Sequence, residues 1–97
     1  MNRDAVIVIL RREKPFLEQE CGVVSLALFG SAARDQMTKE SDVDVLVEFT
    51  RPITSKKYFD AQFRLEDALG TSVDLVTRTS LKPSLRLFVE KDPIVVD

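Results

Sequence analysis

The fold of this chain is decided by residues 26–49, LALFGSAARDQMTKESDVDVLVEF, in which two apolar runs flank a polar segment. The first run, Val23 to Phe29, ends at Gly30-Ser31, and the Ala-Ala-Arg that follows favours a helix. A helix start leaves backbone N–H groups unsatisfied and carries roughly half a positive charge. Gly30 has no side chain to block a ligand, and Ser31 adds a hydroxyl donor. We therefore predict that this turn binds a phosphate group.

The second run alternates apolar and polar residues, Ser41-Asp42-Val43-Asp44-Val45-Leu46-Val47. The alternation predicts a half-buried strand, residues 43–50, with Asp42 and Asp44 on one face. Aspartate is depleted in strands, and two like charges about 5 Å apart repel by roughly 3 kcal/mol at an effective dielectric near 20. A divalent cation reverses this repulsion, and carboxylate oxygens suit Mg²⁺. We interpret the pair as metal ligands; the alternative is a turn residue followed by a solvent-facing strand residue.

These two motifs carry a family resemblance. Gly30-Ser31-x-Ala33-Arg34 followed by Ser41-Asp42-x-Asp44 resembles the GSxAR…SDxD signature of the minimal nucleotidyltransferases. These are the small antitoxin-type members of the DNA polymerase beta-like superfamily. In that family a third carboxylate lies on a neighbouring strand, and Asp74 in Ser72-Val73-Asp74-Leu75-Val76 matches it. The resemblance spans nearly the whole chain and implies an α+β fold, a small mixed β-sheet flanked by helices.

The resemblance also implies an activity. A Mg²⁺-dependent nucleotidyltransferase moves a nucleoside monophosphate from an NTP, expected here to be ATP, onto a hydroxyl and releases pyrophosphate. Gly30 and Ser31 would hold the β and γ phosphates. Asp42 and Asp44 would hold two metal ions about 4 Å apart, one on the triphosphate and one on the acceptor. Asp74 would share the acceptor's metal and draw the proton from the attacking hydroxyl.

Three polar residues near these motifs have more than one interpretation. Arg34 either neutralises phosphate or pairs with Asp35 on an exposed helix. Ser41 caps or orients the carboxylate loop. Taken alone, Gly30-Ser31 could be an ordinary strand-to-helix turn with the serine as its cap. With the aspartates present, we assign Gly30, Ser31, Arg34 and Ser41 as nucleotide-binding candidates.

The resemblance further implies that the acceptor is a tyrosine on a cognate helical HEPN-type toxin, which makes this chain an antitoxin. The rival hypothesis is a non-catalytic binding module that neutralises its partner by contact. Asp35 favours the rival, because the family usually has glycine after the motif arginine and Asp35 brings a negative charge toward the expected triphosphate. The sequence leaves homo-oligomerisation open.

Composition narrows the function classes. With 97 residues, 44% of them hydrophobic and 31% charged, the chain is expected to form one globular nucleotidyltransferase domain over residues 1–97, without room for a second substrate-binding lobe. The same values exclude disorder and a membrane span. A net charge of −2 disfavours a polynucleotide partner.

Chemistry based on histidine or disulfides is also excluded. The chain has no histidine, so a metal must bind to oxygen ligands, and its single cysteine, Cys21, cannot form an internal disulfide. Cys21 is expected to be a buried apolar side chain. The apolar run Ala5 to Leu10 is too short for a signal peptide, so we expect a cytoplasmic protein.

The N-terminal segment has ambiguous periodicity. Asn2 can cap a helix that begins near Arg3, although residues 6–9, Val-Ile-Val-Ile, also have strong strand propensity. The family resemblance implies a helix. Pro15 then suits the first turn of a second short helix, which Gly22 ends.

Later elements follow from apolar spacing. From Lys56 to Gly70 the pattern predicts a helix with one core-facing apolar stripe, made of Tyr58, Phe59, Ala61, Phe63, Leu65 and Leu69. Residues 72–77 are expected to form a strand and residues 82–91 a helix. Ile94-Val95-Val96 is either a short edge strand or a docking segment for another chain.

Overall fold

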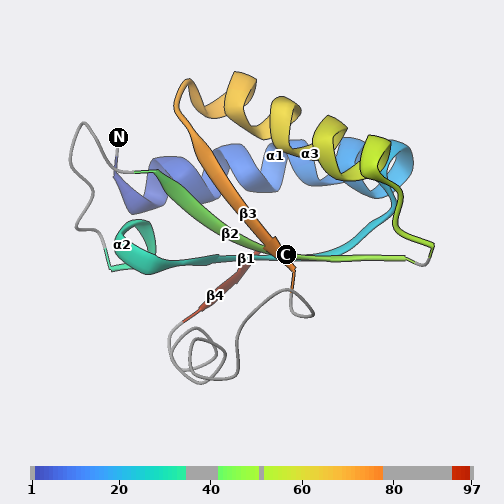
Figure 1. Ribbon diagram of the computed structural model, residues 1–97. Helices are drawn as coiled ribbons and strands as arrows, with labels where there is room; N and C mark the ends of the chain where they lie inside the picture. The colour runs from blue at the N-terminus through green and yellow to red at the C-terminus, as the bar shows by residue number, and fades with distance from the viewer. Residues whose placement is uncertain (1, 35–41, 51, 78–92, 97) are drawn as a thin grey trace.

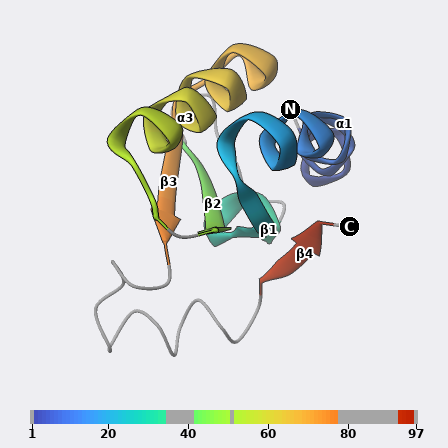
Figure 2. The same cartoon turned by 90° about the vertical axis from the view of Figure 1, so that its right-hand side faces the viewer.

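The computed structural model describes residues 2–34, 42–50, 52–77 and 93–96, which form two layers (Figure 1). The elements are α1 (Arg3–Cys21), β1 (Val23–Phe29), α2 (Gly30–Ala33), β2 (Val43–Phe49), α3 (Ser55–Leu69), β3 (Val73–Thr77) and β4 (Ile94–Val96). Helices α1 and α3 lie side by side over one face of the sheet (Figures 1 and 2). The α+β fold class is therefore confirmed. The helix predicted for residues 82–91, Ser41 and Asp35 lie outside the described residues.

The strand order is β3-β2-β1-β4, and the sheet is mixed. β1 is antiparallel to both β2 and β4, whereas β2 and β3 run parallel. A parallel pair needs a long crossover, and α3 supplies it between these two strands. The C-terminal residues 94–96 pair with β1, which confirms the edge-strand alternative for this segment.

The two faces of the sheet bury different residues. On the helix-covered face, Val43, Val45 and Val47 of β2 join the main core. The other large residues fully buried in this core are Val6, Leu10, Leu17, Leu26, Leu28, Leu65 and Val96. On the opposite face Ala27 and Leu46 form a small second cluster with partly buried Phe29 and Val76. Asp44 also belongs to this second face, because side chains alternate along a strand.

Helix α1 is continuous, so the predicted break at Pro15 was wrong. The helix begins at its predicted cap, where Asn2 Oδ1 accepts from the Ala5 N–H at 2.8 Å, and ends at Gly22 with φ 71°. A proline inside a helix costs about 3 kcal/mol or more. Leu10 and Leu17, on either side of the proline, are both fully buried in one core, and burying each leucine contributes about 1.5–3 kcal/mol. Packing on both sides thus outweighs the cost.

Helix α3 has its predicted ends but not its predicted stripe. Thr54 Oγ1 accepts from the Lys57 N–H at 3.2 Å at the start, and Gly70 with φ 69° follows the last turn. Ala61, Leu65 and Leu69 are buried as expected, whereas Phe59 and Phe63 are 49% and 62% exposed. At 3.6 residues per turn, the two phenylalanines lie about 120° and 160° around the helix from the buried line. The predicted stripe was therefore too wide for one face.

The remaining predictions for single side chains can be located as well. Cys21 is buried and unpaired with any other cysteine, as expected. Lys14 on α1 reaches β4, where its Nζ donates to the Val96 carbonyl at 2.9 Å. Among the described helices, none combines the length and apolarity needed to cross a bilayer.

Candidate active site

Asp44 lies where three elements of the sheet meet. The antiparallel register pairs Asp44 of β2 with Phe29, the last residue of β1, so Asp44 faces the Gly30 turn. On its other side, the parallel register pairs Asp44 with Asp74 of β3. The fold thus brings the glycine turn together with two of the three predicted carboxylates, Asp44 and Asp74. Along the chain, Gly30 is 14 residues and Asp74 is 30 residues from Asp44.

Gly30 and Asp44 are packed directly against each other. Gly30 has φ 71°, a left-handed backbone conformation that costs other residues roughly 1–2 kcal/mol. A Cβ at this position would lie 3.0 Å from the carboxyl carbon of Asp44 and still closer to its Oδ2. An alanine here would adopt this strained φ and would displace the Asp44 carboxylate from its position. The turn and the carboxylate therefore form one structural unit.

The helix that follows β1 is short. Helix α2 is a single turn of four residues, Gly30–Ala33, closed by a hydrogen bond from the Arg34 N–H to the Gly30 carbonyl at 3.3 Å. Its N-cap is Phe29, so the interpretation of the serine as the cap was wrong. A macrodipole needs several aligned turns, and an anion would therefore bind here through individual N–H groups. Ala32 and Ala33 are buried and hold the turn against the core.

Two neighbouring carboxylates and one arginine side chain affect the charge of Asp44. The pKa of Asp44 is raised, first by its partial burial and then by the negative charges of Asp74 and Asp42, whereas Arg34 lowers it. Asp42 lies just before β2, and both Asp42 and Asp74 are exposed. An ionised Asp44 is therefore under electrostatic stress that a cation would relieve.

The donors fit a magnesium ion that is bound together with a nucleotide. Within the described part of the chain, no three acidic side chains converge into a ready-made metal cage. Mg²⁺ typically keeps several waters and binds one or two carboxylates plus substrate phosphates. Asp44 and Asp74, adjacent in register, can supply such carboxylates, with Asp42 beside them. The individual ligand roles of the three aspartates stay predictions.

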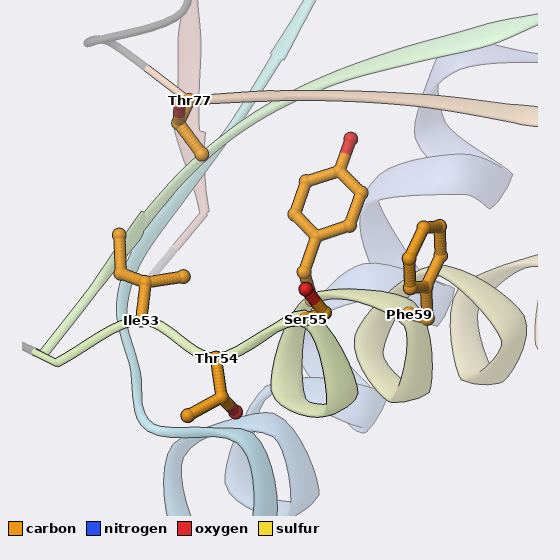
Figure 3. A pocket seen from close by; sticks show the side chains of 6 residues that line it. Ile53, Thr54, Ser55, Phe59 and Thr77 are labelled. Carbon is orange, nitrogen blue, oxygen red and sulfur yellow. The ribbon is translucent and has the colours of Figure 1, made fainter.

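A separate hollow lies at the far end of β3 from Asp74 (Figure 3). It encloses about 390 Å³ and is lined by Ile53, Thr54, Ser55, Tyr58, Phe59 and Thr77. Its lining contains no carboxylate, and Thr77 stands three residues beyond Asp74 on the strand. The lining of the hollow therefore includes none of the three aspartates.

The polar contacts between α3 and β3 were not anticipated. Tyr58, Gln62 and Glu66 hydrogen-bond to the backbone of β3 at Val73 and Leu75, on both sides of Asp74. Their spacing of four residues would have marked them as neighbours on one side of a helix. Nothing in the spacing indicates which strand that side contacts, and the apolar spacing assigns the tyrosine to the core-facing stripe.

Comparison with known proteins gives consistent results. Residues 10–96 match the family model of the nucleotidyltransferase domain. The chain is 42% identical over 89 residues, 91% of each protein, to MJ0128 of Methanocaldococcus jannaschii, which is provisionally named a protein adenylyltransferase. A solved structure provisionally described as a minimal nucleotidyltransferase superposes with a TM-score of 0.82 at 32% identity, covering 97% of this chain and 95% of that one.

A more distant structure shares the fold. It is a chain in the complex of a tri-AMPylated Shewanella oneidensis HEPN toxin with an MNT antitoxin. Its TM-score is 0.66 at 19% identity, with 94% of this chain and 71% of that chain covered. At this identity the likeness concerns the fold alone.

Proposed function

We propose that this chain, which belongs to the nucleotidyltransferase domain family, transfers an adenylyl group from ATP to a hydroxyl of a partner protein. The observation that carries the proposal is the meeting of the Gly30 turn with Asp44 and Asp74 at one end of the sheet. The name of the 42% identical relative, a protein adenylyltransferase, supports AMP as the transferred group.

The chain's own residues divide the work of the reaction. The backbone N–H groups of the Gly30 turn and of α2, with Ser31, receive the triphosphate, and the exposed Arg34 adds positive charge. Asp44 and Asp42 would hold Mg²⁺, which would neutralise negative charge on the triphosphate. Ser41 borders the carboxylates in sequence and is proposed to orient them.

Asp74 acts on the acceptor. Its carboxylate accepts the proton of the attacking hydroxyl, whose oxygen bonds to the α-phosphorus while the bond from that phosphorus to the pyrophosphate oxygen breaks. The proton thus remains on Asp74 or passes to water, and pyrophosphate leaves with its electron pair. Proton transfer of this kind typically contributes 10²–10⁴-fold to a rate.

The proposed acceptor is a tyrosine of a helical HEPN-type partner, with this chain as the antitoxin. One solved chain with the fold of this protein comes from a complex that contains an AMPylated HEPN toxin, which supports this choice. A tyrosine hydroxyl, at the end of a long rigid side chain, can reach a site on an exposed sheet face, and its pKa near 10 makes it easier to ionise than an aliphatic hydroxyl. Because ATP is a cytoplasmic nucleotide, we also propose a cytoplasmic location.

The test is an intact-mass measurement of the proposed HEPN-type partner after incubation with this chain, ATP and Mg²⁺. The expected result is a mass increase of one or more AMP groups. Peptide mapping should locate the added mass only on tyrosine-containing peptides. Asp74→Asn is expected to abolish the increase. Asp67→Asn, the same change at an exposed acid of α3, is the matched control and should leave it intact.

Two outcomes would count against the proposal. A partner that is bound and silenced but keeps its mass would favour the contact-only module. Modification by Asp74→Asn at the native rate would remove Asp74 from the mechanism.

A further inference from the structure

Three polar side chains of α3 bond to the outer edge of β3. Tyr58 Oη donates to the Leu75 carbonyl, and Gln62 Nε2 donates to the Val73 carbonyl at 3.2 Å. Glu66 Oε2 accepts from the Val73 N–H at 3.0 Å. The three residues are four apart, so they stand along one side of the helix, and we call them the polar row.

Within the described residues, the polar row takes the place of a further strand beside β3. Among these residues β3 ends the strand order, with β2 as its neighbour on one side. The outward N–H and C=O groups of such an edge strand are unpaired unless other groups bond to them. Here Val73 uses both its N–H and its C=O toward the polar row, and Leu75 uses its C=O. The edge is thereby closed by side chains.

The bonded positions are the two neighbours of Asp74. Its own register partner across the parallel ladder is Asp44. The strand segment that carries Asp74 is therefore held by β2 on one side and by the polar row on the other. Fixing the backbone on both sides of a residue fixes the direction of its Cα–Cβ bond, and with it the separation of the Cβ atoms of Asp74 and Asp44.

Tyr58 is a rigid member of this row. Its ring packs against Phe49 with centroids 6.2 Å apart and against Phe59 in an edge-to-face arrangement at 5.4 Å. The hydroxyl is thus held toward the Leu75 carbonyl by contacts that do not depend on the hydrogen bond itself. A replacement by phenylalanine would keep the ring packing and remove only the donor.

We infer that Tyr58, Gln62 and Glu66 are positioning residues that set Asp74 against Asp44 for metal binding and nucleotidyl transfer. This inference rests on the proposed function for the reaction, but its first consequence is the affinity of the aspartate site for a divalent cation. Residues that orient metal ligands typically contribute 10–100-fold to metal affinity or activity. A misplacement of 1 Å can cost a reaction as much as 10²-fold.

The test compares two variants at one position, Glu66→Gln and Glu66→Met. Both remove the same charge and keep the unbranched side-chain length, but only glutamine retains an oxygen that can accept from the Val73 N–H. We expect Mn²⁺ to bind Glu66→Met about tenfold more weakly than Glu66→Gln, measured by the free-Mn²⁺ signal in electron paramagnetic resonance. Gln62→Met and Tyr58→Phe should shift affinity in the same direction as Glu66→Met.

Activity gives a second readout in the same variants. The kcat of Glu66→Met should fall about 10-fold or more relative to Glu66→Gln, while KM for ATP stays within about twofold, because the polar row contacts Asp74's strand and not the glycine turn. Asp67→Asn, on the same helix, is expected to match the wild-type chain in both measurements.

The outcomes separate this inference from the proposed function. A wild-type chain that binds Mn²⁺ but transfers no nucleotide contradicts the proposed function, and the Mn²⁺ affinities of the two Glu66 variants still decide the inference. Equal Mn²⁺ affinity in Glu66→Gln and Glu66→Met overturns the positioning role. A wild-type chain that binds no Mn²⁺, either alone or together with ATP, overturns it too, since there is then no metal site to position.

Discussion

The two faces of β2 differ in what they contribute. Val43, Val45 and Val47 are at most 1% exposed and pack under α1 and α3, whereas Asp44 on the opposite face carries a charge that its surroundings disfavour. Neighbouring residues of one strand therefore serve stability and chemistry separately. The same alternation holds on β3, where Val73 and Leu75 are buried and Asp74 is exposed. A change to the valines of β2 should mainly affect the fold, and a change to Asp44 or Asp74 should mainly affect the site.

The largest effect is expected when a carboxylate is placed on the buried face of β2 by the substitution Val45→Asp. Val45 is fully buried, and an unpaired ionised group in a core costs several kcal/mol, against a total stability of about 5–15 kcal/mol for a typical domain. We expect loss of the cooperative thermal transition in circular dichroism. A variant that melts within a few degrees of the wild-type chain would show that the two faces are not distinct.

A smaller effect is expected for Gly30→Ala, which forces a Cβ against Asp44. The strained φ costs roughly 1–2 kcal/mol, and the collision displaces the carboxylate, so adenylyl transfer should fall about 100-fold or more. Gly70→Ala is the matched control, because Gly70 has nearly the same φ, 69°, and nothing within 4 Å of its Cβ position. It should lose similar stability and keep its activity. Equal losses of activity in both variants would contradict a specific contact between Gly30 and Asp44.

Asp44→Asn should change stability and activity in opposite directions. It removes the charge repelled by Asp74 and Asp42, so without metal the melting temperature at pH 7 should rise by about 4–8 °C for each kcal/mol relieved. Transfer should be abolished. Glu48→Gln, the same kind of change on the same strand face but at the end away from Gly30, should keep transfer within about twofold.

The stability gain of Asp44→Asn should depend on pH with a defined sign. The folded pKa of Asp44 lies above its unfolded value, so the folded state of the wild-type chain binds a proton more readily. Its stability therefore falls as pH rises from the unfolded to the folded pKa and stays low above that window. The advantage of the asparagine variant should be full at neutral pH and vanish below the unfolded pKa. An advantage that grows on acidification would contradict the raised pKa.

How much could be predicted from the sequence depends on the range of the interaction. The period-2 pattern around Asp44, the cap Asn2 and the helix-ending glycines Gly22 and Gly70 are local features, and the predicted elements match the structure there. The continuity of α1 through Pro15 and the exposure of Phe59 depend on packing between distant segments. Asp74 was assigned as the third carboxylate only through the family resemblance, because its register with Asp44 is fixed only when the sheet assembles. The polar row could not be assigned for the same reason.

The most direct test of the central claim is whether metal and nucleotide bind cooperatively at the aspartate face. Melting temperature should be measured for the wild-type chain with Mg²⁺, with ATP and with both. At 100 times the dissociation constant, MgATP adds about 2.7 kcal/mol, which should raise the melting temperature by about 10 °C or more, while either component alone has a much smaller effect. Asp44→Asn should lose most of this shift. An equal shift in that variant, or no shift with any nucleoside triphosphate at millimolar Mg²⁺, would contradict the assignment of the site to Asp44.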